Sequence, residues 1–262
     1  MNEQILTKIR ALLAKAESTQ FPEEARSYAA KAQELMTKWA IDEAMLRAAQ
    51  GGNDDERDLA SINQTDIWID ANEYRGPKLE LLGHLVKVND CHWVMYRQQY
   101  RMIDGQRKRQ FKVGIIGFPD DRKMIEVMFT SLLTQAAQES LRPEVLDTMT
   151  SECAQGGHRI AWKNSFVTAF ARSVGARLLA IKRATEQQAS VQYGENPLAM
   201  VLVRKDSLVE RKFKEMYPKL RKCKASSHAN FVGSAFGLGR EAGNRADLGQ
   251  PKVGGNRHQI SG

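Results

Sequence analysis

The stretch ILTKIRALLAKAESTQFPEEARSYAAKAQELMTKW, residues 5–39, decides the N-terminal part of the fold. In residues 5–16, Ile and Leu recur at helical spacing and form one apolar stripe, which predicts an amphipathic helix. The segment ESTQFPEEA interrupts that pattern. Pro22 suits the first turn of a second helix, and the two glutamates after it favour the positive end of a helix. With the second helix at residues 22–39, the segment is expected to form a helical hairpin.

A third short helix is predicted to begin at Asp42, because aspartate is a good N-cap residue. The segment QGGNDDERD, residues 50–58, has no apolar anchor and carries like charges, which is typical of a linker. We therefore expect a helical module at residues 1–50, an acidic linker at residues 51–64, and an α/β domain with a basic C-terminal region at residues 65–262.

The remaining chain alternates between strand patterns and helix patterns. Strands are predicted at residues 65–70, 91–101, 111–118 and 198–203, helices at residues 76–90, 120–141, 158–188, 206–220 and 227–246, and a break at residues 142–157. The expected fold class is α+β: an N-terminal helical hairpin module, followed by a mixed α/β domain with a small sheet and a basic helical C-terminal region.

The length and the cysteine content indicate the compartment. A chain of 262 residues can bury a substantial core. The three cysteines are irregularly spaced, which argues against a disulfide framework and for a reducing environment. The N-terminus lacks the features of a signal peptide, and the longest apolar runs are too short to cross a bilayer. We expect a cytoplasmic protein that does not contact a membrane.

The net charge of +8 is unevenly distributed along the chain. Residues 1–60 hold 8 Lys and Arg against 11 Asp and Glu, whereas residues 201–262 hold 13 against 5. The C-terminal region alone therefore equals the excess of the whole chain. A one-sided basic surface is how binding to a phosphate backbone begins. The alternative is that these basic residues only keep the protein soluble.

Two basic clusters carry the nucleic-acid hypothesis. The first contains Lys219, Arg221, Lys222 and Lys224, and Arg240 and Arg245 could extend it from the next helix. The second contains Arg107, Lys108 and Arg109, in a segment that is expected to be a turn between two strands. Such clusters can contact the phosphates of DNA or RNA without contacting bases. The order of elements around the second cluster is similar to that of small RNA-binding sheets, although a basic turn can also be merely solvated.

Residues 5–42 also carry a family pattern. It consists of an Ile/Leu-x-Lys-Ile-x-x-Leu-Leu start, a Glu-Glu-Ala second-helix start, Lys-Ala-Gln-Glu-Leu-Met, and a closing Ile-Asp. This pattern resembles the N-terminal module of an uncharacterised family of bacteria and their phages, known as a domain of unknown function. The segment AGNRADLG, residues 242–249, resembles the far end of such proteins. The resemblance implies a phage or prophage context and supplies no activity and no catalytic residues.

The glycine-rich segment GLGREAG, residues 237–243, lies close to a dinucleotide-binding fingerprint. It has one residue too many before the last glycine, and it follows no predicted strand. We expect a helix that packs closely through its small residues, which are Ala229, Gly233, Gly237 and Gly243. The sequence contains no Gly-Lys-Ser/Thr phosphate-binding motif, and no cofactor is predicted.

The metal-binding and catalytic alternatives have weaker support. Two Cys-x4-His pairs, Cys153 with His158 and Cys223 with His228, could together supply four zinc ligands. They match no standard zinc finger, so we expect buried cysteines, surface histidines and no bound metal. Neither Gly-x-Ser-x-Gly nor His-Glu-x-x-His occurs. An enzyme would need a site assembled from distant residues such as Asp120 with one of the two histidines.

Three functional hypotheses follow from the sequence. The first is a non-catalytic nucleic-acid-binding accessory protein associated with a phage or prophage. The second is an adaptor that docks a host or phage protein through the N-terminal helical module. The third is an enzyme with an unrecognised site.

Overall fold

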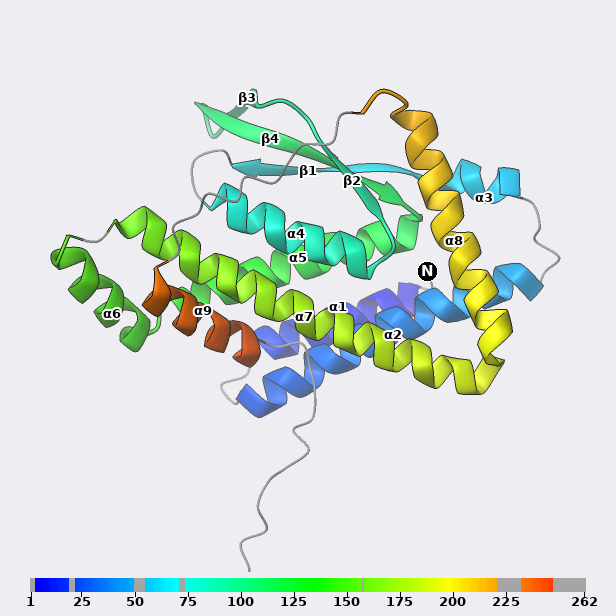
Figure 1. Cartoon of the computed structure of the whole chain (residues 1–262), viewed down its shortest axis with the longest axis horizontal. Coiled ribbons are helices and arrows are strands. Elements are labelled where there is room, and N and C mark those ends of the chain that lie inside the picture. The colour runs from blue at the N-terminus through cyan, green and yellow to red at the C-terminus, as the bar shows by residue number, and fades with distance from the viewer. Residues whose placement is uncertain are drawn as a thin grey trace, which may run out of the picture.

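The computed structural model describes residues 3–18, 22–49, 55–70, 74–156, 158–220 and 232–246. These residues form long helices around one small antiparallel sheet, which confirms the α+β class (Figure 1). The helices are α1 (Glu3–Ser18), α2 (Pro22–Ala49), α3 (Asp55–Ser61), α4 (Arg75–Val88), α5 (Pro119–Ser140), α6 (Pro143–Ala154), α7 (Arg159–Tyr193), α8 (Glu195–Met216) and α9 (Gly233–Arg245). The strands are β1 (Asn63–Asp70), β2 (His92–Met95), β3 (Gln99–Ile103) and β4 (Gln106–Gly117).

Strand β4 organises the sheet, because the other three strands all pair with it in antiparallel register. Its residues 110–117 pair with β1, and its residues 113–116 pair with β2 on the other side. Its first five residues, 106–110, pair with β3. The predicted strand at residues 91–101 is therefore two strands. Strand β2 pairs with the C-terminal part of β4, and β3 pairs with its N-terminal part.

The two faces of the sheet are covered differently. Alternate side chains of a strand point to opposite faces, so Val113 and Ile115 of β4 face the same side. These two residues belong to one large core together with residues of α4, α5 and α7. On the other face, Ile116 packs with Val94 and with Leu208 of α8. Figure 1 shows α4 and α5 below the sheet and α8 crossing one end of it.

The N-terminal hairpin is part of the same core. Ile9 of α1 and Met36 of α2 are buried in the cluster that contains the residues of α4, α5 and α7. Helix α2 continues without interruption to Ala49, so the prediction of a separate third helix from Asp42 is wrong. Asp42 does not cap a helix; its carboxylate accepts a hydrogen bond of 2.7 Å from the Tyr193 hydroxyl of α7.

More than half of the predicted acidic linker is regular structure. Residues 51–54 lie outside the described residues, whereas residues 55–64 form α3 and the start of β1. The acidic side chains of α3 have a partner: Arg204 of α8 lies 2.8 Å from Asp55 and 2.8 Å from Asp58. Two of the like charges that predicted a linker are therefore paired with a helix that is distant in the sequence.

Two further elements differ from the predictions. The predicted break at residues 142–157 contains α6, which begins at Pro143, a residue that favours the first turn of a helix. The predicted strand at residues 198–203 is the start of α8. An apolar run of six residues fits a buried strand and a buried helix equally well, so only the tertiary environment separates the two.

Helix α9 packs closely on α7 through glycine, as expected, but of the predicted glycines only Gly243 makes the close approach, together with Gly239. A Cβ added at Gly239 would lie 2.1 Å from the Phe166 backbone oxygen, and one at Gly243 would lie 2.7 Å from the Phe170 backbone oxygen. Added Cβ atoms at Gly233 and Gly237 would meet nothing within 4 Å. Residue 229 of the predicted small-residue face lies outside the described residues.

Candidate nucleic-acid interface

The basic segment at residues 107–109 lies on a strand and not in a turn, so that part of the prediction is wrong. The turn of the β3–β4 hairpin is formed by Asp104 and Gly105, which have φ values of 51° and 73°. Two positive φ values at the centre of a two-residue loop are what a tight hairpin requires, and Asp-Gly is a favoured pair for them. The turn is therefore shorter than predicted, and the three cations belong to β4.

The β3–β4 hairpin extends beyond the other two strands. The pairing of β1 with β4 ends at Gln110, so residues 106–109 pair with β3 alone among the described residues. We call the paired residues 99–103 and 106–110 the ribbon. Residues 97–112 hold six Lys and Arg and only one acidic residue. The ribbon is therefore a strongly basic two-stranded projection.

The pairing register assigns each ribbon side chain to a face. Residues directly opposite one another in antiparallel strands point to the same side. Tyr100 pairs with Arg109, and Met102 pairs with Arg107, so these four share the face on which Val113 lies. Gln99, Arg101, Gln106 and Lys108 lie on the other face. Both faces of the ribbon are mostly exposed.

On the first face, cations and aromatic rings are stacked in succession. The guanidinium carbon of Arg107 lies 4.3 Å from the centre of the Tyr100 ring. That of Arg75, at the start of α4, lies 4.9 Å from the centre of the Phe111 ring, two residues beyond Arg109. The Lys163 ammonium of α7 lies 5.9 Å from the Tyr74 ring. We call this set the cation–aromatic strip: Tyr74, Arg75, Tyr100, Arg107, Arg109, Phe111 and Lys163.

Three elements that are distant in the sequence bring the strip together. The starts of α4 and α7 lie on the same side of the molecule as the β3–β4 hairpin, at the left of Figure 1. Tyr74 precedes α4 with a positive φ of 54°, and its carbonyl accepts the Lys78 N–H at 2.8 Å. This first turn places Tyr74 and Arg75 side by side beside the sheet. Each stack lies within the roughly 6 Å at which a cation is attracted by a ring.

On the other face, one cation lies on an aromatic ring and another is neutralised by a carboxylate. Arg101 lies over the Trp68 ring at 4.2 Å. Lys112 forms an ion pair of 2.8 Å with Asp66 and lies 4.7 Å from the Tyr96 ring. The hydrogen bond to Asp66 raises the pKa of Lys112, so this ammonium is held charged by its own carboxylate. This face therefore offers less positive charge to a ligand than its sequence indicates.

The predicted C-terminal basic cluster is only partly within the described residues. Lys219 is exposed just after α8, whereas Arg221, Lys222 and Lys224 lie outside the described residues. Arg240 is exposed on α9. Figure 1 shows α9 and the end of α8 on opposite sides of the molecule, so the structure does not join Lys219 to the α9 cations.

Arg245 has a structural role. Its guanidinium lies 2.9 Å from the Glu139 carboxylate of α5 and 3.8 Å from Glu241 on its own helix. Arg245 thus helps to hold α9 against α5, and it contributes little charge to a phosphate-binding surface.

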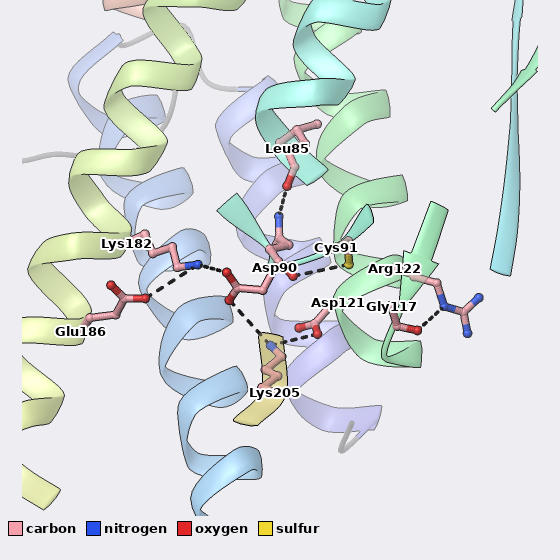
Figure 2. A network of polar contacts seen from close by, with 10 residues as sticks. Leu85, Asp90, Cys91, Gly117, Asp121, Arg122, Lys182, Glu186 and Lys205 are labelled. Carbon is pink, nitrogen blue, oxygen red and sulfur yellow. Dashed lines mark hydrogen bonds and ion pairs between the residues drawn. The ribbon is translucent and has the colours of Figure 1, made fainter. Parts of the chain in front are cut away.

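A second candidate site is the network of charged side chains in Figure 2. Lys205 of α8 lies 2.9 Å from Asp121, at the start of α5, and 4.0 Å from Asp90, in the turn after α4. Lys182 of α7 pairs with the same Asp90 and lies 3.7 Å from Glu186. The network therefore joins α4, α5, α7 and α8.

Burial and pairing act against each other in this network. Burial raises the pKa of Asp121, and the nearby Lys205 ammonium opposes that rise. Burial lowers the pKa of Lys205, but the attraction of Asp121 and Asp90 outweighs it, so the net pKa is raised and the amine stays charged. Burial also raises the pKa of the adjacent Cys91 thiol, which makes it a poor nucleophile.

The network fits a structural junction better than an active site. The two pockets beside it leave about 40 Å³ and about 20 Å³ of space for water, which is room for ordered water and not for a substrate. The described residues contain no group of three or more His, Cys, Asp and Glu that could hold a metal ion. The opposite charges compensate one another, as buried ion pairs must.

The structure describes only some of the residues named for an enzyme or for zinc. Asp120 lies at the start of α5, and His158 lies beyond its far end, before α7. Cys153 is a free, partly buried cysteine of α6. Residues 223 and 228, the other pair of the zinc hypothesis, lie outside the described residues.

The sequence did not indicate half of the strip. The alternation in residues 99–109 could have shown that Tyr100 and Arg107 share a face, had the short Asp-Gly turn been recognised. Nothing in the local sequence marks Arg75 or Lys163 as part of a binding surface, because each is a single cation at the start of a helix. Only the packing of α4 and α7 against the sheet places them beside the ribbon.

A family model described as "Protein of unknown function (DUF2786)" matches residues 4–43, which cover α1 and most of α2. The chain carries a DUF2786 domain. This confirms the resemblance to an uncharacterised family, and the DUF2786 match lies wholly within the N-terminal hairpin. No curated protein and no solved structure matches the chain. In the part of the chain that the structure describes, no helix is both long enough and apolar enough to cross a membrane.

Proposed function

We propose that this protein is a non-catalytic nucleic-acid-binding accessory protein that contacts phosphates through the cation–aromatic strip. The observation that carries the proposal is the strip itself: four cations from three elements along one surface. Its charge complements a phosphate backbone, and aromatic rings hold Arg75, Arg107 and Lys163 in place before any ligand arrives. Such preorganisation lowers the entropic cost of ordering these side chains when a ligand binds.

The state of these cations also supports the proposal. Arg75, Arg107 and Lys163 form no ion pair with a carboxylate of the described residues; their contacts are with aromatic rings. Arg204 and Arg245, by contrast, are held by carboxylates. A cation on a ring keeps its full charge available to a phosphate, whereas one in an ion pair must first give up its partner.

The proposal also includes the C-terminal cluster around Lys219 as a second phosphate-binding segment, a cytoplasmic location and a phage or prophage context. The first rests on four cations within six residues, the second on the irregular cysteines, and the third on the resemblance described above. DNA and RNA both present the phosphates that this function requires.

A salt titration tests the proposed function. Binding of duplex DNA, single-stranded DNA and duplex RNA is measured by fluorescence anisotropy over a range of salt concentrations. The variant Arg75→Ala, Arg107→Ala, Lys163→Ala should bind more weakly than the wild type. Its log–log salt dependence for duplex DNA should be flatter by about 2 to 3, because each duplex phosphate contact contributes about 0.9.

The matched control removes three exposed cations elsewhere, with Lys87→Ala, Lys123→Ala and Arg183→Ala, and should leave the slope nearly unchanged. A third variant replaces Lys219, Arg221, Lys222 and Lys224 with Ala and measures the share of the C-terminal cluster. The proposal fails if no nucleic acid binds at low salt, or if the strip variant and the control behave alike.

One observation favours the adaptor alternative. Large apolar side chains are exposed where α2, α7 and α8 end or begin: Leu46, Val191, Met200 and Val203 are 52%, 86%, 73% and 66% exposed. An exposed apolar surface at the end of the helical module would suit a protein partner. If nucleic-acid binding fails, replacing Leu46, Met200 and Val203 with Ser should abolish co-purification of a partner from phage-infected cells.

A further inference from the structure

The shape of the ribbon limits which nucleic acid it can bind. Residues 99–103 and 106–109 form two strands that no other described strand joins, and both faces carry mostly exposed side chains. Strands pair about 4.8 Å apart and rise about 3.4 Å per residue, so the five residues of β3 extend about 17 Å. The major groove of B-form DNA is about 12 Å wide and 8.5 Å deep, and it admits a two-stranded ribbon. The ribbon is therefore narrow enough to enter that groove and long enough to reach its floor.

One face of the ribbon suits contact with base edges. Tyr100 and Met102 are 54% and 68% exposed, although both are large apolar residues. Arg107 shares this face, and its guanidinium is positioned over the Tyr100 ring. In the major groove, thymine presents a methyl group that apolar side chains contact, and guanine presents two acceptors that arginine contacts in a bidentate manner. An exposed methionine beside a positioned arginine fits this surface.

The cation–aromatic strip continues from that face of the ribbon toward the starts of α4 and α7. One residue separates Arg109 from Phe111 along β4, so both lie on this face, and Arg75 stacks on the Phe111 ring. Lys163 follows at the start of α7. With Met102 and Arg107 in the groove, the cations nearer the helices would lie over the adjacent backbone. Contacts to phosphates fix the register, and contacts to bases provide any specificity.

Single strands and RNA fit less well. Sequence-tolerant binding of single strands depends on stacking of bases on aromatic rings. The rings of Trp68, Tyr96 and Tyr100 each already carry a cation of the protein, at 4.2 Å, 4.7 Å and 4.3 Å. The major groove of A-form RNA is too deep and narrow for side chains to contact base edges.

We infer that the ligand is B-form duplex DNA and that the β3–β4 ribbon enters its major groove, with Met102 and Arg107 toward the base edges and Arg75, Arg109 and Lys163 toward the phosphates. This inference rests on the proposed function. It goes beyond it by naming the kind of nucleic acid and the groove.

The test compares four probes at one salt concentration: a random-sequence DNA duplex of about two helical turns, its single strands, the matching RNA duplex, and the DNA duplex with glucosylated hydroxymethylcytosine, whose sugar fills the major groove. The unmodified duplex should bind at least about ten-fold more tightly than the other three. Netropsin, which occupies the minor groove, should not compete.

Two variants refine the result. The double variant Arg107→Ala, Met102→Ala should reduce the preference for unmodified over glucosylated DNA. The double variant Arg75→Ala, Lys163→Ala should weaken binding of unmodified and glucosylated DNA by the same factor, so the preference stays intact. Equal binding of all four probes would overturn the groove assignment while leaving nucleic-acid binding in place. Absence of binding to every probe would instead overturn the proposed function.

Discussion

At the scale of single residues, position in the tertiary structure decides what a residue type does. Arg245 and Arg107 are both arginines of predicted basic clusters, yet one is held by Glu139 and the other lies on an aromatic ring. Gly239 and Gly237 are two residues apart on α9. Only Gly239 faces α7, where any side chain would meet the Phe166 backbone. Sequence identifies such residues as candidates, but the neighbours determine their role.

The two glycines give a matched stability prediction. Gly239→Ala should lower the free energy of unfolding by roughly 1–3 kcal/mol, because the new Cβ cannot be accommodated without moving α9 from α7. Gly237→Ala should leave stability unchanged or raise it by up to about 1 kcal/mol, since alanine favours a helix and its Cβ meets nothing. Urea unfolding of both variants measures the difference. Equal effects would contradict the packing of α9 on α7 described above.

At the scale of elements, the contact between α4 and α7 contains a buried histidine. A Cβ added at Gly175 of α7 would lie 2.4 Å from the His84 ring of α4, so the missing side chain is what lets the ring fit. The Nε2 atom of His84 is buried and has no hydrogen-bond partner among the described residues. Burial lowers the pKa of His84 from 6.5, and Glu80 opposes this while Lys87 and Arg172 add to it.

This contact predicts a pH dependence of stability. As the pH falls below 6.5, the unfolded chain binds a proton at His84 that the folded chain does not, so stability decreases until the lowered folded pKa is reached. The variant His84→Gln cannot bind this proton, and its unfolding free energy should fall less over the same interval. Chemical unfolding of both proteins above and below pH 6.5 measures it. Identical pH profiles would show that His84 is as accessible to protons in the folded chain as in the unfolded one.

At the scale of the whole molecule, the helical hairpin that carries the DUF2786 match is packed into the core of the rest. Ile9 and Met36 are buried with residues of α4, α5 and α7, and α3 is tied to α8 through Arg204. The division into a helical module and an α/β domain remains a prediction. The shared core implies that the two parts are stable together.

Limited proteolysis tests that implication. A protease that cuts between residues 49 and 55 should leave the two fragments associated, because Ile9 and Met36 share a buried core with α4, α5 and α7. The nicked protein should elute from gel filtration as one species and separate only in denaturant. A stable fragment that begins near residue 60 and elutes alone would show instead that the module is only tethered.

The sequence by itself determined the helical hairpin, the strands at residues 65–70 and 111–118, the helices at residues 76–90, 120–141 and 158–188, and the basic character of residues 107–109, since each depends on local periodicity or composition. Only the tertiary structure decided the rest. The apolar run at residues 198–203 lies in α8, and the packing of α8 against α2 and the sheet favours the helix over a strand. The strip exists because α4 and α7 carry Arg75 and Lys163 to the side of β4. Local patterns report which face of an element is apolar, but they contain no information about which distant element will cover that face, so a surface built from three elements can be found only after the chain has folded.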